Sequence, residues 1–223
     1  MKGIILAGGS GTRLYPLTSV TSKQLLPVYD KPMICYPLST LLLLGITEIL
    51  IISTPMDTPI IESYLGNGKQ FGISISYSTQ KKPNGIAEAF LLAEDFIDGG
   101  EVCLILGDNI FSFVSNPRNI RPQLGFSGAQ LVAYHVSDPN RFGVVELGEG
   151  KNVVSLEEKP EKPRSNFAAT GLYFYDGSVS KVAKSLKKSK RNELEITDLN
   201  NVYLEQRSLS CVVLPRGSIW VDA

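Results

Sequence analysis

Short apolar runs alternate with stretches of helical spacing through the first half of the chain. Four runs have the length and composition of buried strands, at residues 2–6, 48–53, 73–78 and 102–106. Apolar positions recur at helical spacing between them, at residues 33–44, 59–65 and 85–96. Thr58 and Pro59 predict the cap and the first position of the second helix, because proline is favoured in the first turn. This alternation predicts a mostly parallel sheet covered by helices on both faces.

The second half of the chain has a different pattern. Strands are expected at residues 131–136, 144–147, 153–156 and 172–175. The short turns between them contain Gly and Asn, which favours antiparallel pairing. Helices are expected at 179–186 and 199–206, the latter capped by Thr197 or Asp198, and residues 111–127 predict an irregular surface segment. The predicted fold class is α/β, a Rossmann-like mixed and mostly parallel sheet flanked by helices, with an antiparallel elaboration.

Composition narrows the class of protein. With 223 residues and 43% hydrophobic content, the chain can form one sizeable core. The 22 basic and 22 acidic residues cancel, so bulk charge favours neither polymeric nucleic acid nor an anionic membrane as a partner. The apolar runs at 4–7 and 41–44 are too short for a signal peptide or a membrane span. Three widely spaced cysteines argue against a zinc or disulfide framework, and we expect a soluble cytoplasmic protein.

A glycine-rich turn, LAGGSGTRL at residues 6–14, follows the first predicted strand. Ligands of open α/β sheets bind beyond the carboxyl ends of strands, and glycines let backbone N–H groups approach phosphate closely. The turn lacks the Gly-Lys-Ser/Thr of a Walker A loop, and Leu14 stands where a Rossmann fingerprint has its third glycine. The alternative is a purely structural turn. Arg13 and, ten residues later, Lys23 favour phosphate binding.

Two aspartates follow apolar runs that are far apart in the sequence. Asp108 comes after residues 104–106 and Asp222 after residues 219–221. Mg²⁺ is commonly held by one or two carboxylates together with phosphate oxygens and water, so the pair suits a magnesium site. The alternative is that both are solvated strand-end residues. His135, the single histidine, lies in a predicted strand, where a structural role is expected.

Several motifs together resemble one family. Residues 6–13 and the stretch KQLLPV at 23–28 resemble the signature of sugar-phosphate nucleotidylyltransferases. Further stretches, in family order, resemble the thymidylyltransferase branch: KPMI at 31–34, GDN at 107–109, FGVVE at 142–146, EEKP at 157–160, TGLYFYD at 170–176, ELEITD at 193–198 and WVD at 220–222. The resemblance implies the nucleotide-diphospho-sugar transferase fold. It also implies one domain over 1–223, with a nucleotide-binding part at about 1–110, a sugar-phosphate-binding part at about 129–223, and a C-terminal helical segment missing.

The resemblance also implies a reaction. A thymidylyl group would pass from dTTP to glucose-1-phosphate with Mg²⁺, releasing pyrophosphate and supplying dTDP-glucose for dTDP-L-rhamnose synthesis. The partners would be these two substrates and further copies of the chain in a homo-oligomer, without nucleic acid or membrane. One alternative is a transferase that uses UTP or another sugar phosphate. The other is a noncatalytic sugar-nucleotide-binding subunit, which should have lost Arg13, Lys23 or an aspartate.

Site residues carry over by motif. Nucleotide binding falls to Leu6, Gly8, Gly9, Ser10, Gly11, Thr12, Arg13, Lys23, Gln80, Gly85 and Asp108. Sugar-phosphate binding falls to Gly143, Glu158, Lys159 and Arg191, and metal binding to Asp108 and Asp222. Arg13 and Lys23 are the expected catalytic residues. The family usually has Gly after the arginine at 191 and Asp before the glycine at 85, where this chain has Asn192 and Asn84.

The position of Arg13 generates the first prediction. Arg13→Ala should lower kcat/KM by roughly 10²–10³-fold, because a planar cation that stabilises developing negative charge is removed. The free energy of unfolding should change little. Pyrophosphate release and urea unfolding measure the two effects, and near-normal turnover in the variant would exclude the proposed role.

Overall fold

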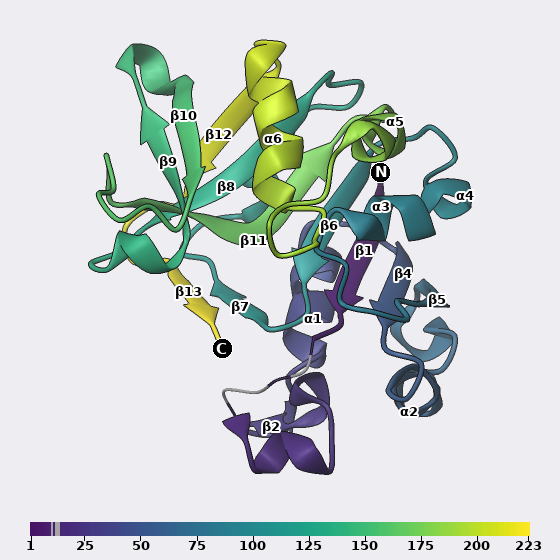
Figure 1. Cartoon of the computed structure of the whole chain (residues 1–223). Helices are drawn as coiled ribbons and strands as arrows, with labels where there is room; N and C mark the ends of the chain where they lie inside the picture. The colour runs from purple at the N-terminus through teal and green to yellow at the C-terminus, as the bar shows by residue number, and fades with distance from the viewer. Residues whose placement is uncertain (10, 12–13) are drawn as a thin grey trace.

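Four parallel strands form one half of a nine-stranded mixed sheet (Figure 1). In this computed structural model, which describes residues 1–9, 11 and 14–223, β1 (Lys2–Ala7) lies between β6 (Val102–Leu106) and β4 (Glu48–Ser53). The edge strand β5 (Ser74–Thr79) pairs with β4. All four strands match the sequence-based prediction to within one residue at each end.

The strand β11 (Phe167–Tyr175) joins this parallel half to the second half of the chain. Along one edge it pairs antiparallel with β8 (Ala129–His135), and along the other edge it pairs antiparallel first with β9 (Gly143–Leu147) and then with β6. A register shift between Ala169 and Tyr173 accompanies its change of partner. The hairpin partner β10 (Val153–Glu158) extends the sheet beyond β9. The predicted antiparallel elaboration is confirmed, with one exception: β12 (Leu209–Val213), which was not predicted, pairs with β8 in parallel.

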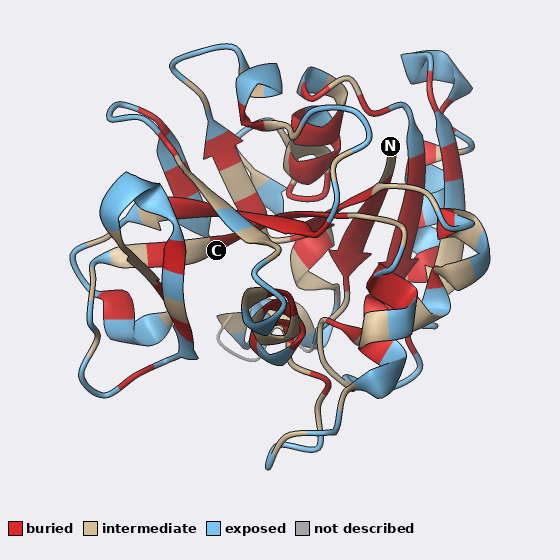
Figure 2. Ribbon diagram, turned by 90° about the horizontal axis from the view of Figure 1, so that it is seen from above, coloured by how far each residue is buried: buried red, intermediate tan, exposed pale blue. Residues whose placement is uncertain are grey.

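Helices cover both faces of the sheet, and the central strands are almost wholly buried (Figure 2). One face carries α1 (Cys35–Leu43) and α2 (Thr58–Leu65). The other face carries α3 (Glu88–Leu92), α4 (Glu94–Ile97), α5 (Val179–Ser185) and α6 (Ile196–Glu205). The predicted α/β fold class, a mostly parallel sheet flanked by helices, is confirmed.

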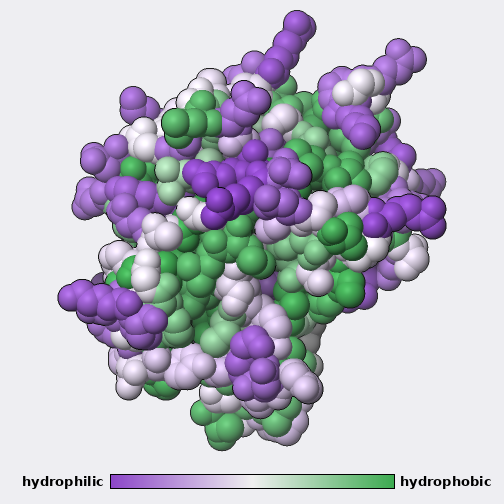
Figure 3. Space-filling model, turned by 180° about the vertical axis from the view of Figure 1, so that it is seen from behind, coloured by the Kyte–Doolittle hydropathy of each residue, from purple (hydrophilic) through white to green (hydrophobic). Residues whose placement is uncertain are grey.

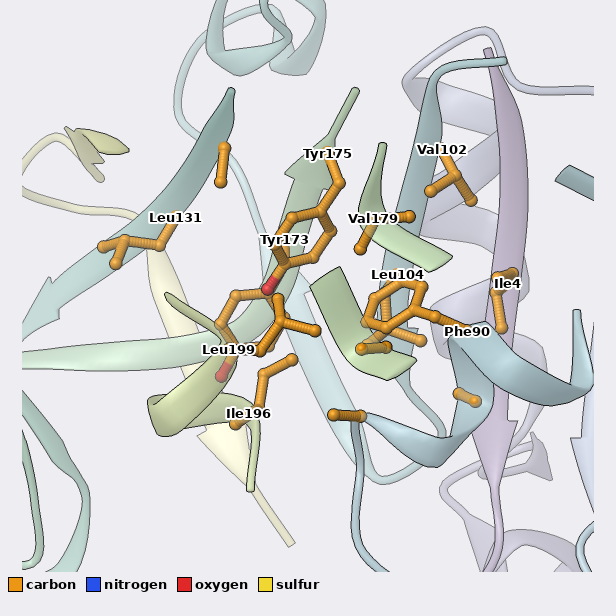
Figure 4. Close-up of a cluster of buried hydrophobic side chains, with 14 of the residues drawn as sticks. Ile4, Phe90, Val102, Leu104, Leu131, Tyr173, Tyr175, Val179, Ile196 and Leu199 are labelled. Carbon is orange, nitrogen blue, oxygen red and sulfur yellow. The ribbon is translucent and has the colours of Figure 1, made fainter. Parts of the chain in front are cut away.

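Alternate residues of the central strands serve the two faces, because successive strand side chains point in opposite directions. Ile4 and Leu104 pack in the core beneath α3, α5 and α6, together with Phe90 and Tyr175 (Figure 4). Ile5 packs in the other core, against α1 and α2. Burial on both faces explains why these strands read as continuous apolar runs rather than alternating ones.

Several predicted boundaries were wrong. Residues 85–96 form two short helices rather than one, because Gly85 has φ +102° and the chain leaves helical geometry again at Ala93. The N-cap of α2 is Asp57 rather than Thr58, and α6 begins at Ile196, after Glu195. In each case the first turn starts one or more residues earlier than the capping pattern indicated.

Part of the segment predicted as irregular forms a strand. Here β7 (Asn109–Ser112) pairs antiparallel with β13 (Ile219–Asp222), so that Asn109 lies opposite Asp222. The rest of the segment contains a 3-10 turn at Pro117–Ile120. Local sequence could not reveal β7, because the partner strand lies more than one hundred residues away.

The segment that follows the glycine-rich turn projects from the body of the molecule at the lower end of Figure 1. It contains the two-residue strands β2 (Pro27–Val28) and β3 (Lys31–Pro32), which were not predicted. Tyr15, Val20 and Tyr29 are exposed on it, and Figure 3 shows hydrophobic residues at the same end, among a mixed surface. Within the described residues, no helix is long and apolar enough to cross a membrane.

Candidate active site

A cavity of about 710 Å³ is lined by residues at the ends of β1 and β6 and by residues of the hairpin β9–β10. Eleven of the residues singled out from the sequence line it: Leu6, Gly8, Gly9, Gln80, Gly85, Asp108, Gly143, Glu158, Lys159, Arg191 and Asp222. Lys23 reaches the same place through Asp108. Gly11 lies on the turn beside Lys23, while Ser10, Thr12 and Arg13 lie outside the described residues. The structure therefore brings the predicted nucleotide and sugar-phosphate residues into one cavity.

Gly85 joins the two walls of the cavity. A Cβ at this position would lie 2.3 Å from the carbonyl oxygen of Leu194, so only glycine fits. The close approach is held by two backbone hydrogen bonds: Leu194 N–H donates to Asn84 and Ala87 N–H donates to Leu194. The loop that carries Gln80 is thereby tied to the segment that precedes α6, which carries Arg191.

The floor of the cavity holds Asp108, Asp222 and Lys23. Asp108 lies in the turn between β6 and β7, and Lys23 Nζ donates to its Oδ2 at 2.8 Å. Asp222 comes from β13, and the β7–β13 pairing brings its backbone opposite Asn109. This pairing explains how two carboxylates so far apart in the sequence reach one place.

The carboxamide of Asn109 binds both aspartates. Its Nδ2 donates to Asp108 Oδ1 at 3.1 Å and to Asp222 Oδ1 at 3.2 Å. Its Oδ1 accepts from the backbone N–H of Gly171 at 2.9 Å and from Trp220 Nε1 at 2.6 Å. The side chain is fully buried and uses both of its donors and both acceptor positions. Asn109 was part of a motif recognised in the sequence, but no role was assigned to it.

The opposite end of the cavity holds Glu158 and Lys159, at the end of β10. Thr197 Oγ1 donates to Glu158 Oε2 at 2.7 Å, and the Lys159 ammonium lies 3.6 Å from Glu158 Oε1. Lys159 has φ +45°, and its N–H donates to the carbonyl of Phe142. A Cβ at Gly143 would lie 3.4 Å from Glu158 Oε2, an ordinary van der Waals distance, so Gly143 lies directly beside the carboxylate.

Arg191 is held by Glu195 in a bidentate ion pair. Arg191 Nε and an η-nitrogen donate to the two carboxylate oxygens at 3.1 and 2.8 Å, and Ser189 Oγ donates to Glu195 at 2.7 Å. The hydrogen bond to Glu195 raises the pKa of the Arg191 guanidinium. Burial alone would raise the pKa of the Glu195 carboxyl, but the bonds from Arg191 and Ser189 hold it below its usual value. Asn192 has φ +62°, a conformation that Asn tolerates well, so it can replace the family's Gly.

Glu195 and Tyr173 are further lining residues that were not assigned a role from the sequence. Glu195 lies four residues after Arg191, a spacing that could have indicated the ion pair only if both had been expected on one helix. Burial, with smaller effects from Glu158 and Asp222, raises the pKa of the Tyr173 phenol well above its usual value, so it stays protonated at neutral pH. No single-residue signal in the sequence marked either residue.

The donor set of the floor fits a hard divalent cation. Two carboxylates are typical for Mg²⁺, which completes its coordination with water and phosphate oxygens. Within the described residues, no group of three or more His, Cys, Asp and Glu side chains is arranged to hold a metal by itself. The arrangement therefore suits a cation that arrives with a phosphate ligand rather than a fully protein-coordinated one.

Open α/β sheets bind nucleotides in a cavity at the carboxyl ends of their parallel strands, next to a glycine-rich turn. Fold and cavity together define a nucleotide-binding α/β protein. The sequence profile of the family named Nucleotidyl transferase matches residues 2–223. The chain therefore belongs to the nucleotidyl transferase family, whose members are enzymes.

Relatives of known name support this assignment. The chain is 56% identical to glucose-1-phosphate thymidylyltransferase of Neisseria meningitidis over 225 residues, which cover all of this chain and 77% of that protein. It is 52% identical to the protein of the same name from Mycobacterium tuberculosis, with the same coverage of each.

Two solved structures share the fold. A glucose-1-phosphate thymidylyltransferase from Bacillus anthracis, in complex with a sucrose, matches with a TM-score of 0.89 and 44% identity. The match covers all of this chain and 89% of that one. A UDP-glucose pyrophosphorylase complexed with UDP-glucose matches with a TM-score of 0.81, covering 99% of this chain and 92% of that one. At 23% identity, the second match shows the fold alone.

The Asn109 contacts generate a prediction about stability. Asn109→Asp keeps an acceptor for Gly171 and Trp220 but replaces the shared donor by an anion between two carboxylates. The free energy of unfolding should fall by about 2–4 kcal/mol at pH 8, and by less at pH 5, where protonation of the new carboxyl relieves the repulsion.

Asn109→Leu is the matched control. It leaves two buried donors unpaired at every pH and adds no third charge beside the carboxylates, so its loss of stability should depend on pH less than that of Asn109→Asp. Urea unfolding of both variants at pH 5 and pH 8 provides the measurement. A stable Asn109→Asp variant at pH 8 would show that the amide does not hold the carboxylates together.

Proposed function

We propose that this chain transfers a thymidylyl group from dTTP to glucose-1-phosphate, releasing pyrophosphate. The observation that carries the proposal is the single cavity that has the glycine-rich turn and Gln80 on one wall, and Glu158, Lys159 and Arg191 on the other. A cavity of this kind can hold a nucleotide and a sugar phosphate side by side. The names of relatives at 52–56% identity support the same substrate pair.

The proposed division of the chain follows from this arrangement. Residues up to about 110 would bind the triphosphate, and residues from about 129 onward would bind the sugar phosphate. Glu158 would accept hydrogen bonds from sugar hydroxyls, and Gly143 lies beside it. Lys159 and Arg191 would hold the sugar's phosphate. Because Glu195 already orients Arg191, little side-chain freedom remains to be lost when the phosphate binds.

The nucleophile in this proposal is an oxygen of the sugar phosphate. The second pKa of the phosphate group is ~6, so the group is ionised at neutral pH and needs no general base. It would attack the α-phosphorus in line, and pyrophosphate would leave from the opposite side. Lys23 and Arg13 would neutralise the charge that develops on the transferred group. Catalysis then consists of positioning and electrostatic stabilisation.

Nucleotidyltransferases generally use a divalent metal ion, and we propose that Mg²⁺ is the ion here. Asp108 and Asp222 would hold it, and Asn109 would keep the two carboxylates oriented toward it. The ion would supply charge neutralisation at the triphosphate. Lys23 contacts Asp108 directly, so its ammonium would add positive charge at the same place.

UTP is a second candidate substrate. Gln80 would hydrogen-bond the base, and uracil offers it the same edge as thymine. A single methyl group discriminates only about 10–200-fold in an apolar pocket. A noncatalytic binding subunit is disfavoured, since Lys23, Asp108 and Asp222 are all retained. Assembly into a homo-oligomer and a cytoplasmic location stay predictions from the sequence.

The test of the proposed function is a pyrophosphate-release assay with four triphosphates against a panel of hexose-1-phosphates. We expect dTTP and UTP to be used with glucose-1-phosphate, and ATP and GTP to be at least about tenfold poorer, because a mismatched buried polar group costs ~1–3 kcal/mol. A preference for ATP or GTP would contradict the thymidylyl assignment. Absence of pyrophosphate release with every pair of triphosphate and hexose-1-phosphate would contradict the assignment as an enzyme.

Asp222→Asn tests the metal site. The change removes one negative ligand while preserving shape, so the Mg²⁺ concentration for half-maximal activity should rise. Direct titration of Mn²⁺ by calorimetry in the presence of dTTP should show weaker binding. Asp95→Asn, an exposed position on α4, is the control and should match the wild type. Full activity of chelator-treated wild-type protein without added metal would contradict the site.

Lys159→Ala tests the sugar-phosphate end. KM for glucose-1-phosphate should rise, while the Kd for dTTP should stay near the wild-type value, because the lysine follows β10 whereas Gln80 follows β5. Lys162→Ala, an exposed lysine three residues further on, is the control. Equal weakening of both substrates would count against the assignment.

A further inference from the structure

The side-chain amide of Gln80 is fixed in one orientation by two acceptors. Its Nε2 donates to the carbonyl oxygen of Gly85 at 3.1 Å and to Glu88 Oε2 at 2.7 Å. A carbonyl oxygen can only accept, and a carboxylate also only accepts, so both amide protons of Gln80 are used. The reverse orientation would place Oε1 against two acceptors. The amide nitrogen and oxygen are similar in size, so the hydrogen-bond partners are what assign them. Here they leave the Oε1 end free.

Glu88 is itself held in place. Its second oxygen, Oε1, accepts from Asn84 Nδ2 at 2.7 Å, and the backbone carbonyl of Asn84 accepts from Leu194 N–H. Glu88 is the first residue of α3 and does not line the cavity. It contacts Gln80 from outside the cavity and is held by the loop whose Gly85 is packed against Leu194. Asn84 is the position where this chain departs from the family pattern, and its amide supplies the donor that anchors Glu88.

The free end of the Gln80 amide faces the cavity. A Cβ on Gly8 would lie 3.1 Å from Gln80 Oε1, and both residues line the cavity wall. Gln80 is 92% buried, so a group that meets Oε1 there is shielded from water and must supply a donor to avoid a lost hydrogen bond. At this point of the cavity, Gln80 offers only an acceptor. A glutamine without these contacts would offer both a donor and an acceptor.

We infer that Glu88 is a specificity-determining positioning residue, which orients Gln80 so that its Oε1 accepts from the imide N3–H of thymine or uracil. This inference rests on the proposed function, in which Gln80 reads the base. Cytosine has the same ring size but carries a lone pair at N3, which would face Oε1 with like polarity. Discrimination against CTP would therefore come from a carboxylate that never touches the nucleotide.

The experiment compares UTP with CTP, which differ in hydrogen-bonding polarity rather than in size. Glu88→Gln replaces the obligate acceptor by a group that can also donate, so the Gln80 amide can turn over. We expect the ratio of kcat/KM for UTP to that for CTP to fall about tenfold, as expected for losing one hydrogen bond to a charged group. Calorimetric Kd values for both triphosphates, without sugar phosphate, should change in the same direction. Glu88→Met, which also removes the acceptor, is measured alongside in case one variant folds poorly.

Three outcomes are distinguishable. If Glu88→Gln weakens UTP and CTP by the same factor, Glu88 is only structural and the inference is overturned. If Gln80→Leu also leaves the ratio unchanged, Gln80 does not read the base, and that part of the proposed function fails with it. If Gln80→Leu lowers the ratio and Glu88→Gln does not, the base-reading role stands and the inference alone is wrong. Glu94→Gln, a helix carboxylate paired with Lys184 away from the cavity, is the matched control and should keep the wild-type ratio.

Discussion

The carboxamide of Asn109 is the contact on which the floor of the cavity depends. It hydrogen-bonds side chains or backbone from three separate segments: the turn after β6, the strand β11, and β13. Two of its four partners are carboxylates, which would otherwise repel one another across a small space. The floor can therefore carry concentrated negative charge without a bound ion, and the pairing of β7 with β13 keeps that charge at the ends of β1 and β6.

On both walls, too, one polar side chain orients another by hydrogen bonds. Glu88 orients the amide of Gln80, Glu195 orients the guanidinium of Arg191, and each uses carboxylate oxygens that can only accept. In both pairs the residue that faces the cavity is not the one that fixes its direction. Gly85, packed against Leu194, connects the loop that carries Gln80 to the segment that carries Arg191. Preorganised polar groups of this kind are what a reaction that relies on positioning requires.

The sequence predicted the parts of the molecule whose signals are local. The strands β1, β4, β5 and β6 could be placed because burial on both faces makes them continuous or regular apolar runs. The glycine-rich turn, Asp108 and Asp222 could be singled out because they follow apolar runs at strand ends, where ligands bind, whereas the other site residues were assigned from the family resemblance. Pairing between distant segments left no local trace, so β7 and β12 were missed. Glu88 was read only as part of a helix, since its partners Gln80 and Asn84 precede that helix on a loop whose path is set by Leu194.

The cavity offers positioned charge rather than a protein nucleophile. Among its described lining residues there is no serine, cysteine or histidine. Burial raises the pKa of the Cys103 thiol far above its usual value and that of Cys211 to about 12, and neither lines the cavity. This lining fits the proposed direct attack by the sugar phosphate on the α-phosphorus. The most direct test is the stereochemical course with a single diastereomer of dTTP that carries sulfur on the α-phosphorus. One in-line displacement predicts inversion at that phosphorus, whereas retention would reveal two displacements through a covalent enzyme intermediate and contradict direct attack.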